Sequence, residues 1–174
     1  MHLRKRTAGL AAGAAAMVTA AVLGTALPAQ AYDPDPTYTS IGRDTDGCPC
    51  SGGNLTDPFD GTYFNHDAGG YARKVELYKG DWFIGKVEFH PSGEKLWIYD
   101  TKNDGDTFYV RMWVDNHDGH GNTGWGTWAA PGTSAVMDYR TVDLRNVAEG
   151  ATVKMGLYDD AATTDLITTV YATG

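Results

Sequence analysis

Two cysteines separated by one proline form the most reactive pair of side chains in this sequence. Cys48 and Cys50 are the only cysteines among the 174 residues. In an oxidising compartment such a pair is expected to form a disulfide, which would pin the segment around it. A metal or redox site is the weaker interpretation, because no other cysteine pair or histidine lies close by and a thioredoxin motif has two intervening residues. Pairing between two chains stays open.

Two acidic segments contain residue types that bind cations. Residues 100–106 begin like a calcium loop, but Lys102 and Arg111 occupy the third and twelfth positions, where such loops carry acidic side chains. Residues 115–122 combine His117 and His120 with aspartates, a set that suits a divalent ion. A glycine-rich loop does not hold such ligands at a fixed spacing, however. We therefore interpret both segments as solvated loops and predict no metal and no cofactor.

No arrangement of residues indicates catalysis. None of the serines Ser40, Ser51, Ser92 and Ser134 lies in the glycine-flanked elbow of a hydrolase nucleophile. The aspartates are concentrated in turns, where their backbone-bonding side chains are favoured. A glycosidase pair is defined by the separation of two carboxylates in space, which a sequence does not show. We predict that the protein is not an enzyme.

Two tryptophans stand among glycines in the run Gly124-Trp125-Gly126-Thr127-Trp128. Tryptophans in a loop can anchor a protein interface or stack on sugar rings. The structural alternative is a lid that folds back over one end of the domain. We name Trp125 and Trp128 as candidate partner-binding residues.

The scaffold that must position these side chains is predicted by the pattern from residue 71 onward. Apolar and polar residues alternate there with a period of two, which is typical of strands with one buried face. In the clearest run, Phe108, Val110, Met112 and Val114 alternate with polar or amphipathic residues. Glycine-containing turns separate the runs at hairpin spacing. The runs are 71–77, 83–89, 96–99, 107–114, 134–144, 152–158 and 166–171.

This pattern predicts an all-β fold without helices. We expect a single antiparallel β-sandwich of seven or eight strands over residues 71–174, with an up-and-down barrel as the alternative. The chain has a length that suits one domain, and a domain of this size can bury a sufficient core without disulfides.

Residues 32–70 read as an extended N-terminal arm. Two prolines in Asp33-Pro34-Asp35-Pro36 disfavour helix, and a short strand is expected at 37–41. Turn and linker composition follows, including the Cys-Pro-Cys turn. We expect such an arm either to be tied down or to become ordered on a partner. The candidate partner-binding residues of the arm are Asp33, Pro34, Asp35, Pro36, Tyr38 and Ile41.

Residues 1–31 have the features of a secretory signal peptide. Arg4, Lys5 and Arg6 precede an apolar, alanine-rich stretch, and Ala29-Gln30-Ala31 fits a cleavage site. Cleavage removes 31 residues and three positive charges, so 174 residues at −8 become 143 at −11. No second apolar run is long enough to span a bilayer, and the acidic balance argues against nucleic acid. We expect a secreted, extracellular protein.

Part of the chain resembles small secreted actinobacterial proteins of β-sandwich type. The resemblance lies in Gly85-Lys86-Val87-Glu88-Phe89, residues 93–100 (GEKLWIYD), Asp104-Gly105-Asp106 and Tyr109-Val110, about a third of the chain. One group that it is similar to, in layout, is the adaptor subunit of umbrella toxin particles from Streptomyces-like bacteria. The resemblance implies a compact β domain that joins a lectin-like subunit to a stalk-like subunit, whose groove takes up an extended N-terminal segment.

The leading functional hypothesis is therefore a secreted, non-enzymatic adaptor that links subunits of an extracellular antibacterial toxin complex. A carbohydrate-binding module that stacks sugars on Trp125, Trp128 and Tyr139 is one alternative. A secreted protease inhibitor that presents the Cys48-Pro49-Cys50 turn is another.

Overall fold

The alternating sequence forms eleven strands in the part of the chain that the computed structural model describes, residues 31–52, 61–132 and 136–174. Within these ranges the chain forms no helix, and hence none long and apolar enough to cross a membrane. The signal peptide that the sequence predicts, apart from Ala31, lies outside the described residues. The strands are β1 (Thr37–Asp44), β2 (Cys50–Ser51), β3 (Tyr63–Phe64), β4 (Tyr71–Lys79), β5 (Trp82–His90), β6 (Lys95–Asp100), β7 (Tyr109–Asp115), β8 (Thr123–Trp128), β9 (Asp138–Asp143), β10 (Thr152–Tyr158) and β11 (Leu166–Thr173).

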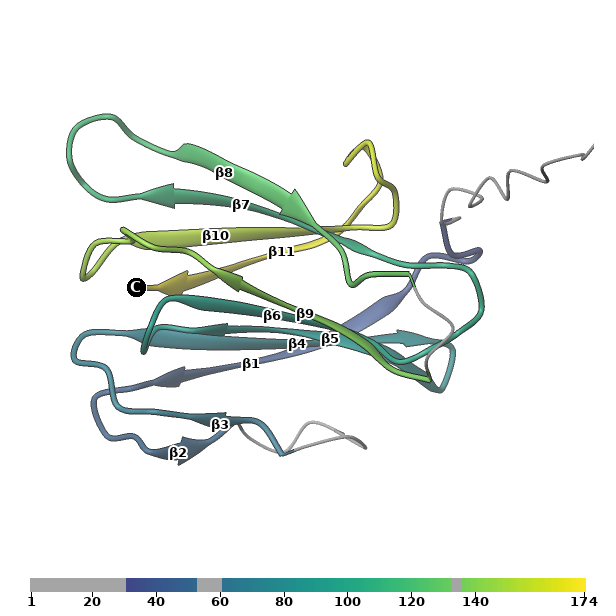
Figure 1. Cartoon of the computed structure of the whole chain (residues 1–174), viewed down its shortest axis with the longest axis horizontal. Helices are drawn as coiled ribbons and strands as arrows, with labels where there is room; N and C mark the ends of the chain where they lie inside the picture. The colour runs from purple at the N-terminus through teal and green to yellow at the C-terminus, as the bar shows by residue number, and fades with distance from the viewer. Residues whose placement is uncertain (1–30, 53–60, 133–135) are drawn as a thin grey trace, which may run out of the picture.

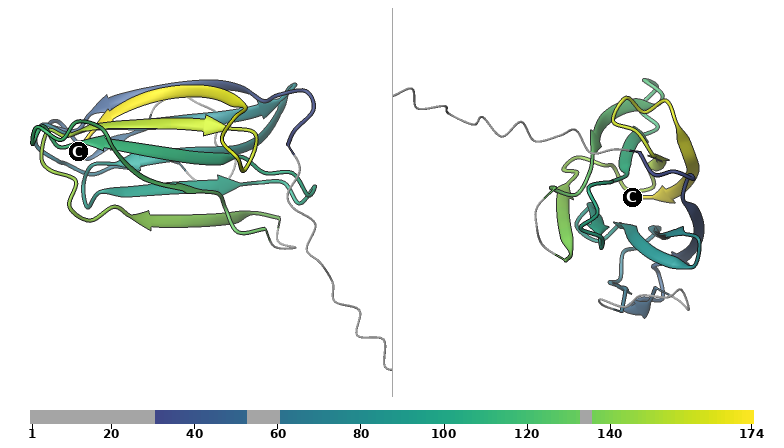
Figure 2. Two further views of the ribbon diagram at one scale, coloured as in Figure 1. Left: turned by 90° about the horizontal axis from the view of Figure 1, so that it is seen from above. Right: turned by 90° about the vertical axis from the view of Figure 1, so that its right-hand side faces the viewer.

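Nine of the strands form one antiparallel sheet (Figure 1). Its order is β8-β7-β10-β11-β4-β5-β6-β9, and β1 also pairs with β4. The connection between β11 and β4 is narrow, a single pair of residues, Thr173 and Tyr71. Figure 2 shows that the strands on the two sides of this connection curl around a shared interior. β2 and β3 form a separate two-stranded sheet.

The shared interior is one hydrophobic core. It receives side chains from both halves of the curled sheet, as expected when each strand turns every second residue inward. Phe108, Val110 and Met112 are each 0% exposed, while Arg111 between them is exposed. The largest fully buried core side chains include Phe89, Phe108, Leu77, Ile84, Leu96, Ile98, Met112, Leu144, Met155 and Leu157.

The all-β prediction is confirmed, and residues 71–174 form eight strands, within the seven or eight expected for that range. β1, β2 and β3 lie before residue 71 and bring the total among the described residues to eleven. Four strands were not predicted as they occur: β2, β3, β8, and the full length of β1. β2 and β3 are two residues each, too short for an alternation to be visible. β8 contains Gly124 and Gly126, which conceal its period. The run expected at 134–144 is realised as β9, and its first residues lie outside the described part.

Candidate interaction surface

β1 belongs to the large sheet along its whole length. Its eight residues pair in antiparallel register with β4, from Thr37 opposite Tyr78 to Asp44 opposite Tyr71. For residues 37–44 this agrees with the alternative that the arm is tied down, because a strand with eight paired positions is held by the ladder and is not a free segment. Among the described strands, β1 pairs with β4 alone, so its other edge pairs with no described strand.

The arm residues named from the sequence are placed differently from one another. Asp33, Pro34 and Asp35 are exposed, whereas Pro36 is buried. Within β1, Tyr38 is 46% exposed and Ile41 is half-buried. The first four residues of β1 are all exposed. These are the properties of an accessible edge strand.

An open pocket of about 280 Å³ lies where β4 and β11 meet. Arg73 crosses it: its Nε donates to the carbonyl oxygen of Tyr171 at 2.9 Å, and its guanidinium lies 5.3 Å from the centre of the Tyr71 ring. Both tyrosines are exposed, Tyr71 by 37% and Tyr171 by 53%. The lining residues are Tyr71, Arg73, Thr152, Tyr171, Ala172 and Thr173.

A glycine of β1 allows the Tyr71 ring to take this place. A Cβ atom on Gly42 would lie 2.4 Å from ring atoms of Tyr71, closer than side-chain contacts allow. The pocket therefore depends on β1, β4 and β11 together. Tyr71, Arg73 and Tyr171 were not named from the sequence as site residues, because residues 71 and 171 come together only through the pairing of β11 with β4.

A charged network is buried on the face of β4 and β5 that points away from the main hydrophobic core. Lys74 Nζ lies 3.0 Å from Glu76 Oε1, and Lys86 Nζ lies 2.8 Å from Glu88 Oε1. The register sets Glu76 opposite Lys86 and Lys74 opposite Glu88. All four residues are 0–2% exposed. The sequence shows alternation here but does not reveal that the polar face is covered as well.

Glu88 is the best-connected member of the network. It accepts hydrogen bonds from Thr62 Oγ1 at 2.5 Å and interacts with His90 Nε2 at 2.9 Å. Burial on its own would raise the pKa of Glu88, but the contacts with His90, Lys86 and Thr62 together hold that pKa below its usual range. Glu88 is therefore ionised and structural at neutral pH.

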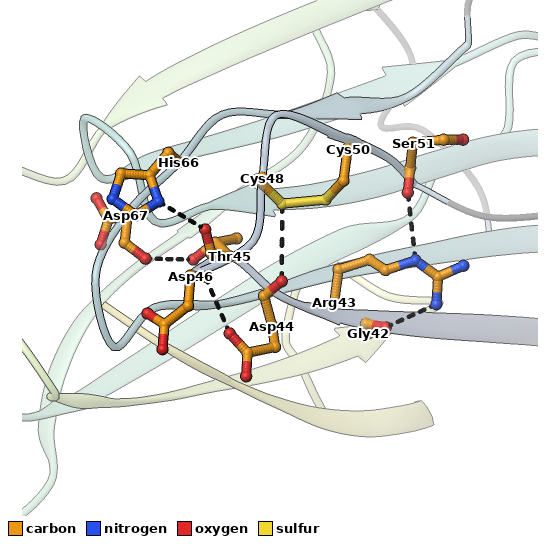
Figure 3. The surroundings of a disulfide bond; sticks show 10 residues. All are labelled: Gly42, Arg43, Asp44, Thr45, Asp46, Cys48, Cys50, Ser51, His66 and Asp67. Carbon is orange, nitrogen blue, oxygen red and sulfur yellow. Dashed lines mark hydrogen bonds between the residues drawn. A yellow bond between two sulfur atoms is a disulfide. The ribbon is translucent and has the colours of Figure 1, made fainter.

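The segment between β1 and β4, whose Thr62 contacts Glu88, covers the charged network and is called the covering segment below. It contains the disulfide. Cys48 and Cys50 are bonded with an S–S length of 2.05 Å, which agrees with the expected local pairing. Cys48 is 7% exposed and packs with Phe64 and Ala72. Figure 3 shows the surrounding contacts, in which Arg43 Nε donates to the carbonyl of Ser51.

The bonded turn thus lies against the sheet. Thr45 Oγ1 donates to the carbonyl of Asp67 at 2.8 Å, which ties the start and the end of the covering segment together (Figure 3). Because Cys48 packs inward, no observation favours the protease-inhibitor alternative.

Trp125 and Trp128 lie on β8, at one end of the strand order. Both are half-buried and pack against the main core from a strand paired with β7, and not from a loop that folds over one end of the domain. Gly126 adopts φ = 155°, and a Cβ there would lie 2.7 Å from the Trp128 ring. Tyr139, on β9 at the other end of the order, is 61% exposed and stacks on Tyr99 with 6.1 Å between ring centres. The structure does not bring these three aromatics onto one strand or one edge.

The two polar loops contain turns stabilised by their own aspartates. Residues 100–106 do not form the hairpin that their spacing predicts, because β6 pairs with β5 and β9 while β7 pairs with β8 and β10. Asp104 Oδ1 accepts from the backbone N–H of Asp106, and Asp118 Oδ1 accepts from that of His120. Among the described residues, the one group of carboxylates and imidazoles spaced for a metal ion lies elsewhere, at Asp35, Asp159 and Asp165. Sequence reasoning missed this group, because its members come from distant parts of the chain.

In comparisons with protein-family models, with curated proteins and with solved structures, the chain matches none of them.

Proposed function

We propose that this protein is a secreted, non-enzymatic adaptor that binds another extracellular protein along β1. The observation that carries the proposal is the exposed edge of β1, which pairs with β4 on one side alone among the described strands. Such an edge offers unpaired backbone groups to an extended segment of a partner. Removal of residues 1–31 during export is part of the proposal.

Side chains beside this edge have the chemistry of an interface. Tyr38, Tyr71 and Tyr171 are exposed near β1 and the pocket that Arg73 crosses. Tyrosine and arginine are the residue types that carry much of the binding energy at protein interfaces. The acidic charge of the chain, −8 overall, favours a partner with a basic surface.

The resemblance to toxin-particle adaptors supplies the kind of partner. The chain would join a stalk-like subunit to a lectin-like subunit, and the two halves of its curled sheet would face each other as the layers of a sandwich. Asp33, Pro34 and Asp35, which are exposed just before β1, would extend the contact with the stalk-like subunit.

The test uses tagged mature protein as bait in the native culture supernatant, with bound chains identified by mass spectrometry. We expect Tyr38→Ala and Tyr171→Ala each to reduce recovery of a specific partner at least tenfold, since a central tyrosine contributes about 2 kcal/mol. Tyr139→Ala, which changes a tyrosine that is also exposed but lies on β9, is the matched control. Equal recovery by all four proteins contradicts the proposal.

A second candidate function is carbohydrate binding at Tyr139. Its ring is exposed and held by stacking on Tyr99, which suits it to stack on a sugar ring. Retention on insoluble cell-wall polysaccharide that is lost in Tyr139→Ala and kept in Tyr38→Ala would favour this candidate over the adaptor.

A further inference from the structure

Asp159, which follows β10, is a buried carboxylate without a full complement of partners. The residue is 1% exposed, and within the described part of the chain neither of its carboxylate oxygens accepts a hydrogen bond of good geometry. A buried charge in this state is costly unless a positive group neutralises it.

The groups around Asp159 increase this cost. Carboxylate oxygens of Asp35 and Asp165 lie with that of Asp159 in a group whose atoms are within 4.8 Å of one another. Asp106 adds a further negative charge. Burial and these neighbours raise the pKa of Asp159 to about 6. Lys79, whose Nζ lies 5.3 Å from the centre of the Tyr32 ring, is engaged with Asp106, at 3.9 Å from its Oδ2.

The polar group that does face Asp159 is the backbone N–H of Tyr32. The Tyr32 side chain is 3% exposed and belongs to the main hydrophobic core, so the position of its backbone nitrogen is fixed. Ala31, immediately before it, is exposed. The buried Tyr32 side chain, and not the residue before it, therefore holds the Tyr32 nitrogen beside Asp159.

Residue 32 is also the residue that follows the expected cleavage site. We propose that cleavage between Ala31 and Tyr32 creates an α-ammonium group that forms a buried ion pair with Asp159 and so completes the fold of the secreted domain. This inference rests on the proposed export and processing of the chain.

The chemistry of the step is a hydrolysis. A signal peptidase adds water across the Ala31–Tyr32 peptide bond, leaving a carboxylate on Ala31 and an amine on Tyr32, which takes up a proton. The single N–H of the amide is thereby replaced by three N–H donors and a positive charge. A tetrahedral ammonium can donate to both oxygens of Asp159, which the planar amide does not do.

A divalent cation is the competing occupant of the three carboxylates. An ammonium is favoured because the Tyr32 nitrogen already faces Asp159. The experiment below separates the two.

The first measurement is the intact mass and N-terminal sequence of the secreted protein. Tyr32 as first residue is expected. If the first residue is not Tyr32, the inference is wrong, because no ammonium group forms on Tyr32. The proposal that β1 binds a partner is unaffected by that result.

The second measurement compares unfolding of four chains at pH 7. These are the mature protein, a chain that retains Ala31 as its first residue, and the Asp159→Asn variant of each. We expect retention of Ala31 to raise the unfolding equilibrium constant on the order of 100-fold in the Asp159 background and hardly at all in the variant. We also expect Asp159→Asn to destabilise the mature protein and to stabilise the chain that retains Ala31. Asp33→Asn, a change of exposed charge next to Tyr32, is the matched control and should act equally in both chains.

Three outcomes of the unfolding measurements would also overturn the inference. One is that retention of Ala31 has no effect, and another is that Asp159→Asn acts with the same sign and size in both chains. The third concerns calcium: if millimolar CaCl₂ raises the unfolding midpoint of the mature and Ala31-retaining chains equally, the carboxylates form a cation site.

Discussion

Lys86 Nζ lies 2.8 Å from Glu88 Oε1, and the two side chains are 0% and 2% exposed. They are two residues apart on β5, so the period of the strand points both to the same face. Neighbouring strands add Lys74 and Glu76 to that face, and the segment carrying Thr62 covers it. A charged layer is thereby enclosed beside the hydrophobic core.

Replacing Glu88 tests how much this charged layer contributes to the free energy of unfolding. We expect Glu88→Gln to lower the free energy of unfolding by about 3–5 kcal/mol at pH 7, because it removes the negative charge between Lys86 and His90. The folded-state pKa of Glu88 is lowered, so its stabilisation is present above the unfolded pKa of about 4.3 and is lost as the pH falls through the lower folded value. Chemical denaturation from pH 2 to pH 7 should therefore show the two proteins converging in acid.

The matched control is Asp143→Asn. Asp143 Oδ2 pairs with Arg145 Nε at 3.2 Å, but the side chains are 50% and 82% exposed. Solvent screens such a pair, and the expected change is below about 1 kcal/mol. A similar loss in both variants would contradict the role given to burial.

Asp100 should give the opposite pH dependence. Burial, with smaller contributions from Asp104 and Asp138, raises its folded-state pKa to about 6. Stability associated with Asp100 is therefore complete below the unfolded pKa of about 3.9 and declines as the pH rises through the folded value. We expect Asp100→Asn to be more stable than the wild type by about 2 kcal/mol at pH 8 and to lack this decline. Thermal unfolding across this range provides the measurement.

An aspartate in a similar turn serves as the control for Asp100. Asp118 Oδ1 accepts from His120 N at 2.9 Å, as Asp100 Oδ1 accepts from Lys102 N at 3.1 Å. Asp118 is exposed. Asp118→Asn should leave the pH profile unchanged, and a profile altered by Asp118→Asn as much as by Asp100→Asn would show that burial is not the cause.

Gly85 on β5 is required by close packing. An added Cβ would lie 2.4 Å from the backbone oxygen of Tyr99 and 2.6 Å from the Phe108 ring. We expect Gly85→Ala to destabilise the protein by about 1–3 kcal/mol, as overpacking of a core does. Gly47→Ala, where no atom lies within 4 Å of the added Cβ, should be close to neutral. Urea titration of both variants would disprove the packing argument if their midpoints coincide.

The disulfide should contribute modestly to stability. It links residues two apart in sequence, and the entropy lost by closing so short a loop in the unfolded chain corresponds to about 1.5 kcal/mol. We expect the Cys48→Ser/Cys50→Ser variant to remain folded, with its unfolding free energy lowered by that order. Complete unfolding of the variant at 25 °C would mean that Cys48 acts mainly through its packing on Phe64 and Ala72.

A strand of this fold could be predicted from sequence where its own residues show a clear alternation of apolar and polar side chains. The alternation of Phe108, Val110, Met112 and Val114 predicts β7 because one side of that strand is buried and the other is not. β8 escaped prediction because Gly124 and Gly126 interrupt its alternation. A strand was expected at 37–41, and its continuation through residues 42–44 escaped because Gly42 begins a stretch of turn-like composition.

What the sequence determined by itself is the set of local features: the all-β class, the hairpins β4–β5 and β5–β6, and the position of a cysteine pair whose bonding partner it left open. Each follows from residues that are neighbours along the chain. Tertiary structure alone decided the burial of the Lys86–Glu88 layer, the pocket between Tyr71 and Tyr171, and the meeting of Tyr32 with Asp159. In each of these, strands or segments that are distant in sequence come together, and the exposure of a side chain depends on what covers it, which no local pattern encodes.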